Sequence, residues 1–220
     1  MYKYILFDLD GTLTDSREGV TKSVRYALEK LGRPVPSDDV LTQFVGPPLQ
    51  ESFPEYGGVT EAEEIRQAIA FFRERYDTVG KFENAAGEGV PEMLAELKAA
   101  GYVLALASSK PEDMCRVICE RYGLAPYLDV IAGSQPGADW QKASVIRLAM
   151  ERMGLGEADK ASLLMVGDRK YDVLGAAEVG VDCLGVEFFG YALPGELMGA
   201  GAVAVVDTPA ELLAWIRAQK

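Results

Sequence analysis

The sequence predicts an α/β fold, a doubly wound and mainly parallel Rossmann-like sheet interrupted by an inserted α-helical domain. Two observations predict this fold. From Gly89 onward, short apolar strand patterns alternate with helix patterns, whereas one long segment before that point carries helix patterns and no convincing buried strand. Alternating strands and helices indicate a parallel sheet with helices on both faces, and such sheets bind ligands beyond the carboxyl ends of their strands.

The core elements follow from local composition. Tyr4-Ile5-Leu6-Phe7 is a run of β-forming residues that polar residues and Gly11 bring to an end, so it predicts a buried strand leading into a loop. Pro111 suits the first turn of a helix, and Gly180 suits the position that ends one. The other expected core elements are helices near 90–100, 142–153, 171–179 and 209–217, and strands near 103–107, 130–131, 162–166, 181–186 and 203–206.

The segment after the first strand interrupts this alternation. Apolar residues recur at helical spacing in it, which predicts helices near 17–31 and 61–79. We therefore expect two domains, whose bounds are 1–14 and 83–220 for a Rossmann-like catalytic core and 15–82 for the helical insert.

Charge and composition exclude several classes of function. The formal net charge of −12 argues against nucleic acid as a partner, because most of the surface would repel phosphate backbones. The 220 residues are 49% hydrophobic and 25% charged, which is typical of a folded globular protein. The chain contains no histidine, which excludes Ser-His-Asp and Cys-His catalysis and histidine-ligated zinc. Acid–base chemistry must therefore fall to carboxylates, lysine, tyrosine or cysteine.

No apolar stretch approaches the roughly 20 residues that a membrane-spanning helix needs, so we expect no membrane partner. The N-terminal apolar run is interrupted by Asp8 and lacks the flanks of a secretory signal, so we expect a cytoplasmic location. Cys115, Cys119 and Cys183 cannot all pair within one chain and are expected to be buried free thiols. The sequence carries no pattern that predicts an oligomeric state.

Polar side chains follow the strand ends at which a parallel sheet binds ligands. If the strands lie parallel, these side chains converge on one edge of the sheet although they span most of the sequence. Neighbouring carboxylates repel one another, so a divalent cation is the economical explanation, and oxygen ligands favour Mg²⁺. A lysine and a serine hydroxyl beside such an ion form a cradle for phosphoryl oxygens. The residues are Asp8 and Asp10, then Ser108, Ser109 and Lys110, then Gly167 and Asp168, together with Lys142 at a helix start.

These residues form motifs that resemble, in order, the four motifs of the haloacid dehalogenase superfamily. The likeness covers nearly the whole chain and is closest to phosphoglycolate phosphatase-like and 5′-nucleotidase-like members. The helical insert directly after the first motif is similar to the cap domain of that family. The four matching motifs are Asp8-Leu9-Asp10-Gly11-Thr12, Ser108, Lys142, and the segment from Gly167-Asp168 to Asp172.

The resemblance implies a role for each residue. It makes Asp8 the nucleophile that takes up the phosphoryl group, and Asp10 the acid that protonates the leaving oxygen and later activates water. Ser108 and Lys142 complete the catalytic set. The residues implied to bind the substrate phosphate are Asp10, Gly11, Ser108, Ser109 and Lys142. The residues implied to hold Mg²⁺ are Asp8, the backbone carbonyl of Asp10, Asp168, and Asp172, which would act through water or by helping to fix Lys142 and the ion.

The expected function is a Mg²⁺-dependent phosphatase that acts on a small phosphate monoester through a phospho-aspartate. Phosphoglycolate, a nucleoside monophosphate and a sugar phosphate all fit. A phosphomutase of the β-phosphoglucomutase type uses the same phospho-aspartate and is the alternative enzyme, while a phospho-accepting, receiver-like signalling module is the alternative outside enzymes. Lys110 and Arg169 fit either substrate binding or a solvated position at a helix start, so neither is assigned.

Overall fold

The computed structural model describes residues 1–135 and 141–219, which form two compact units. One unit contains residues 1–14 and the chain from residue 86 onward, and the other contains residues 15–85. Residues 83–85, which the sequence analysis assigned to the core, therefore lie in the helical unit. Glu83 makes a side-chain and a backbone contact within that unit. Its carboxylate pairs with Arg75 at 2.7 Å, and its carbonyl accepts a hydrogen bond from the amide of Gly19 at 3.0 Å.

The larger unit is built on a parallel sheet, as predicted. Within the described residues it has six strands in the order β5-β4-β1-β6-β7-β8, and every neighbouring pair is parallel. The first strand thus lies in the middle of the sheet, between two strands that come much later in the sequence. The strands are β1 Tyr4–Phe7, β4 Val103–Pro111, β5 Val130–Ser134, β6 Leu163–Gly167, β7 Asp182–Val186 and β8 Ala204–Val206.

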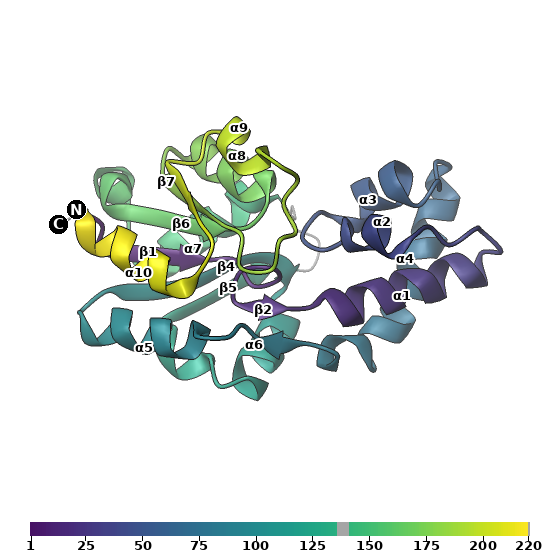
Figure 1. Cartoon of the computed structure of the whole chain (residues 1–220), viewed down its shortest axis with the longest axis horizontal. Coiled ribbons are helices and arrows are strands. Elements are labelled where there is room, and N and C mark those ends of the chain that lie inside the picture. Colours follow the sequence, from purple (N-terminus) through teal and green to yellow (C-terminus); the bar gives the residue numbers. More distant parts are fainter. Residues whose placement is uncertain (136–140, 220) are drawn as a thin grey trace. The chain divides into compact units, whose positions relative to one another are not determined.

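Helices cover both faces of this sheet (Figure 1). The side chains of Ile5 and Phe7 pack with apolar residues of α5, α6 and α10, while Leu6 between them faces the side covered by α7, α8 and α9. Strands that are buried on both faces are expected to be apolar throughout, and this one is. The helices are α5 Val90–Ala99, α6 Glu112–Arg121, α7 Lys142–Arg152, α8 Lys170–Val179, α9 Glu196–Ala200 and α10 Pro209–Ala218, with short 3₁₀ helices at Ala125–Tyr127 and Glu157–Ser162.

Two details of the core differ from the prediction. Strand β4 runs four residues past its expected end at Ala107, because it continues to pair with β5 beyond a register shift between Ser108 and Pro111. Helix α9 was not predicted, since its five residues are too few to show a helical period. None of the helices in the described ranges is long and apolar enough to cross a membrane.

The smaller unit is helical. The predicted helices are present as α1 and α4, which pack against each other. Two shorter helices were missed; α3 contains Pro54, a residue that in a sequence usually indicates a helix end. The elements are α1 Arg17–Lys30, α2 Asp38–Thr42, α3 Leu49–Tyr56, α4 Ala62–Tyr76 and a 3₁₀ helix at Gly80–Phe82, with the short strands β2 Thr14–Asp15 and β3 Ala85–Ala86 where the chain enters and leaves the unit.

Candidate active site

The loop after β1 holds its shape through backbone contacts. The amide of Asp8 still donates to the carbonyl of Val166 in β6 at 3.0 Å, so this residue lies at the very end of the strand. The chain then turns, with Gly11 at a φ of +86° that favours glycine. A Cβ atom on Gly11 would lie 2.1 Å from Oδ2 of Asp168, so the turn also needs glycine for space. Gly11 thereby lets the loop approach the end of β6.

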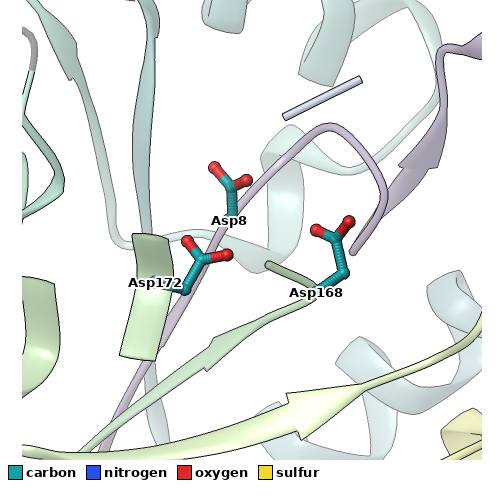
Figure 2. Close-up of side chains that lie close together, drawn as sticks. All are labelled: Asp8, Asp168 and Asp172. Carbon is teal, nitrogen blue, oxygen red and sulfur yellow. The ribbon is translucent and has the colours of Figure 1, made fainter. Parts of the chain in front are cut away.

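Three aspartates that are far apart in the sequence meet at this edge of the sheet (Figure 2). Asp8 follows β1, Asp168 follows β6, and Asp172 lies in the first turn of α8. One carboxylate oxygen of each lies within 4.8 Å of those of the other two, and all three residues are buried. Thr12 donates a hydrogen bond to Oδ1 of Asp168 at 2.9 Å. Oδ2 of Asp168 has no hydrogen-bond partner among the described residues, although it is buried.

Lys142, the first residue of α7, provides a positive charge beside this cluster. Its Nζ atom lies 2.7 Å from Oδ1 of Asp8 and 2.8 Å from Oδ1 of Asp172, and it donates a hydrogen bond to the carbonyl of Ala107 at 3.1 Å. The lysine is only 7% exposed. It fits because Gly175 of α8 leaves room, since a Cβ atom there would lie 2.6 Å from the Cβ of Lys142. The lysine thus bridges two of the three carboxylates.

Burial and mutual repulsion shift the ionisation of these groups. Burial lowers the pKa of Lys142, but the carboxylates of Asp172 and Asp8 outweigh it and raise the pKa, so the ammonium stays charged. Burial raises the pKa of Asp8 and is opposed by Lys142. The pKa of Asp168 is raised well above its usual value, first by burial and then by the negative charges of Asp172 and Asp8. One lysine therefore does not neutralise three buried carboxylates.

The remaining negative charge fits a hard divalent cation. Several oxygen ligands face one another, one of them is an unsatisfied buried carboxylate oxygen, and no sulfur or nitrogen ligand belongs to the cluster. This donor set is the one that Mg²⁺ prefers. The members of the cluster, Asp8, Asp168 and Asp172, were all predicted, although Asp172 lies as close as the other two instead of behind them. The fourth predicted metal residue, Asp10, was assigned through its backbone carbonyl, and its side chain is not in the cluster.

The carboxylate of Asp10 pairs instead with a second lysine. Nζ of Lys110 lies 2.5 Å from Oδ2 of Asp10, and both side chains are largely buried. The sequence alone does not assign Lys110, because a lysine at a helix start is usually solvated. The feature of the sequence that could have identified Lys110 as a site residue is its position at the same strand end as Ser108 and Ser109. Ser108 is buried and its Oγ accepts a hydrogen bond from the amide of Lys110 at 3.4 Å, while Ser109 is half-buried beside it.

Comparison with known proteins agrees with this architecture. The family model described as haloacid dehalogenase-like hydrolase matches residues 5–186. The chain is 40% identical over 188 residues to a 5′-nucleotidase of Pseudomonas aeruginosa, which covers 85% of this chain and 83% of that protein. It is also 41% identical over 179 residues to the tyrosine-protein kinase PtkA of Mycobacterium tuberculosis, covering 81% of this chain but 60% of that one.

A solved structure of a related protein has the same architecture. A crystal structure of a predicted phosphatase from Clostridium acetobutylicum superposes with a TM-score of 0.90 at 42% sequence identity, and the match covers 98% of both chains. The family match, the parallel sheet and the acidic cluster at its edge all agree. The chain therefore belongs to the haloacid dehalogenase-like hydrolase family, and it is an enzyme of the phosphoric monoester hydrolase class.

Proposed function

We propose that the protein is a Mg²⁺-dependent phosphatase that hydrolyses a small phosphate monoester through a phosphoryl group carried on Asp8. One observation supports this most strongly. Three buried carboxylates from separate segments lie within 4.8 Å of one another and are bridged by a charged lysine. Such a concentration of like charge is costly unless it serves a bound cation and an anionic substrate.

In the first step, a carboxylate oxygen of Asp8 attacks phosphorus and the bond from phosphorus to the ester oxygen breaks. Asp10, two residues further along the same loop, gives its proton to the departing oxygen, so the alcohol leaves neutral. Lys142 lies 2.7 Å from Asp8 and offsets negative charge as the phosphoryl group arrives. The hydroxyl of Ser108 and the backbone of the Gly11 turn bind the phosphoryl oxygens, and Ser109 contributes from the same strand end.

In the second step, water attacks the phosphorus of the phospho-aspartate and the bond to Asp8 breaks, which releases inorganic phosphate. Asp10 now accepts a proton from that water, so it ends in the form in which it began. Lys110, whose Nζ contacts the carboxylate of Asp10, fixes this side chain between the two proton transfers.

Asp8, Asp168 and Asp172 would hold Mg²⁺, together with the backbone carbonyl of Asp10. When bound, the ion neutralises carboxylates and phosphoryl oxygens that would otherwise repel one another. Thr12 restrains Asp168 through its hydrogen bond of 2.9 Å to Oδ1, and Oδ2 keeps no hydrogen-bond donor among the described residues.

The substrate proposal is a small metabolite with one phosphate monoester. The nucleotidase relative favours a nucleoside monophosphate, while phosphoglycolate and sugar phosphates remain within the class.

We assign residues 1–14 and 86 onward as the catalytic core and the helical unit as a cap that selects substrate. The helical unit has a cavity of about 610 Å³ whose basic lining residues are paired with acidic ones, such as Arg25 with Asp38, and whose lining includes none of the predicted catalytic residues. A cytoplasmic location stays a prediction.

The test is phosphate release from purified protein, measured against p-nitrophenyl phosphate and a panel of metabolite phosphates with and without Mg²⁺. Multiple turnovers that require Mg²⁺ and vanish in Asp8→Asn, with an unchanged circular dichroism spectrum, support the proposal. Release of one equivalent of p-nitrophenol, with the phosphoryl group kept on Asp8 and no phosphate released, would indicate a receiver-like module. Isomerised sugar phosphate from β-glucose 1-phosphate would indicate a mutase.

Because one relative is named a tyrosine-protein kinase, the same preparations are also incubated with ATP, Mg²⁺ and a tyrosine-containing peptide. Phosphotyrosine formed without release of phosphate from any ester would contradict the hydrolase proposal. Normal turnover by Asp8→Asn would contradict the phospho-aspartate.

A further inference from the structure

A further buried ion pair, Arg169 with Glu196, begins at the residue next to Asp168. Arg169, the residue after Asp168, is only 2% exposed, and its Nε atom donates to Oε1 of Glu196 at 2.9 Å. The side chain of Glu196 is 6% exposed. From the sequence, Arg169 could either bind substrate or be solvated at a helix start. The guanidinium is instead committed to Glu196, so it is part of the framework around the site.

Glu196 collects hydrogen bonds from two segments of the chain. Its Oε1 atom also accepts from the amide of Lys170 at 2.9 Å, and its Oε2 atom accepts from the amide of Leu193 at 3.1 Å. Burial opposes ionisation, but the hydrogen bonds from Arg169 and these two amides outweigh it and lower the pKa of Glu196. One carboxylate therefore ties the first residues of α8 to the loop before α9.

One tied segment contacts the acidic cluster, and the other packs against the turn that follows Asp8. Arg169 follows Asp168 directly in the chain, and its amide donates to Oδ2 of Asp172 at 3.1 Å, so the backbone of Arg169 is linked to two clustered aspartates. The loop before α9 carries Tyr191, which is fully buried. A Cβ atom on Gly11 would lie 2.7 Å from Cδ2 of Tyr191, so this ring packs against the turn that follows Asp8.

A buried ion pair of this kind holds the backbone in one geometry, although forming it costs free energy. Burying an arginine and a glutamate requires desolvation of both charges, so a buried pair by itself is weak evidence for stability and better explained by the geometry it specifies. Here, any rotation of the backbone at Arg169 that moved the neighbouring aspartates would break the bonds to Glu196. Residues that orient metal ligands from behind contribute strongly to metal affinity.

We propose that Arg169 and Glu196 are positioning residues that hold Asp168 and Asp172 in place for Mg²⁺. This inference rests on the proposed function, because it assumes that the three carboxylates bind the ion. Neither side chain is a catalytic residue, since each acts through the aspartates.

The test compares Mg²⁺ binding by isothermal titration calorimetry in wild type and in Glu196→Gln, which keeps the shape of the side chain and removes its charge. We expect the dissociation constant for Mg²⁺ to rise by about 10–100-fold. The Mg²⁺ concentration for half-maximal activity should rise with it, while kcat at saturating Mg²⁺ recovers most of its normal value. A merely structural role would lower thermal stability in EDTA and leave the dissociation constant unchanged.

The matched control is Glu178→Gln, which removes the charged partner of Arg147 in an exposed ion pair of 3.0 Å between α7 and α8. Its Mg²⁺ affinity should equal that of wild type. If Glu196→Gln does not fold, Arg169→Lys is used, which keeps the charge but loses the second contact, from Nη2 to Oε2 of Glu196 at 3.5 Å. An intermediate loss of affinity is then expected. Unchanged affinity in the folded variant overturns the inference. Absence of Mg²⁺ binding by wild type would instead overturn the proposed function, and the inference with it.

Discussion

Replacing Lys142 with methionine should produce two separable defects. The lysine is 7% exposed, and its Nζ atom lies 2.7 Å from Asp8 and 2.8 Å from Asp172. Methionine fills similar space but leaves the carboxylates without their cation, and breaking a buried pair in this way costs about 3–5 kcal/mol of stability. In the reaction, loss of one preorganised electrostatic contact should lower kcat by about 10²–10³-fold.

The stability defect of Lys142→Met should depend on pH. Burial already raises the pKa of Asp8, and Lys142 opposes this rise, so the variant should raise that pKa further. A carboxyl group whose folded-state pKa lies above its unfolded value binds more protons when folded, so stability falls as pH rises above about 4. The free energy of unfolding in EDTA should therefore recover in the variant as the pH is lowered from about 7 toward 5.

The assay is urea denaturation in EDTA at several pH values, together with phosphate-release kinetics at saturating Mg²⁺. Lys160→Met is the control, because the pair of Lys160 with Glu157 is largely solvated on the glutamate side and should change stability by at most about 1 kcal/mol. Equal losses in the two variants, or an unchanged kcat in Lys142→Met, would refute the reasoning.

Three further predictions test the site and the fold. Gly11→Ala should lower stability by about 1–3 kcal/mol and impair turnover, because φ is +86° and the new Cβ would meet Asp168 and Tyr191; urea denaturation and kinetics measure both. Chelation should abolish turnover reversibly, and Mg²⁺ at 100 times its dissociation constant should stabilise the fold by about 2.7 kcal/mol in thermal or urea unfolding. Burial opposes ionisation of Asp129, but the hydrogen bond from Lys98 and a backbone amide lower its pKa, so its contribution is present above about pH 4 and lost below it. Asp129→Asn should therefore flatten the acid limb of the stability profile, and an unchanged limb would contradict this.

Most of the site could be predicted because it depends on local patterns. An apolar run that stops at Asp8 and another that stops at Gly167 both indicate buried strands, and parallel strands present their carboxyl ends at one edge. The sequence therefore predicts that Asp8 and Asp168 meet. Short helices could not be predicted in this way. Helices α2, α3 and α9 have between five and eight residues, which are too few to establish a helical period.

The sequence by itself determined the fold class, the family resemblance and the identity of the acidic residues, because each depends on residue type and spacing along the chain. Only the tertiary structure decided which basic side chain pairs with which carboxylate. Lys110 pairs with Asp10 across a separation of 100 residues, and Arg169 turns to Glu196 instead of to the substrate site. These pairings depend on the order of the strands in the sheet and on the room for a side chain, such as the room that Gly175 leaves for Lys142. Neither property produces a repeating pattern of residue types in the sequence.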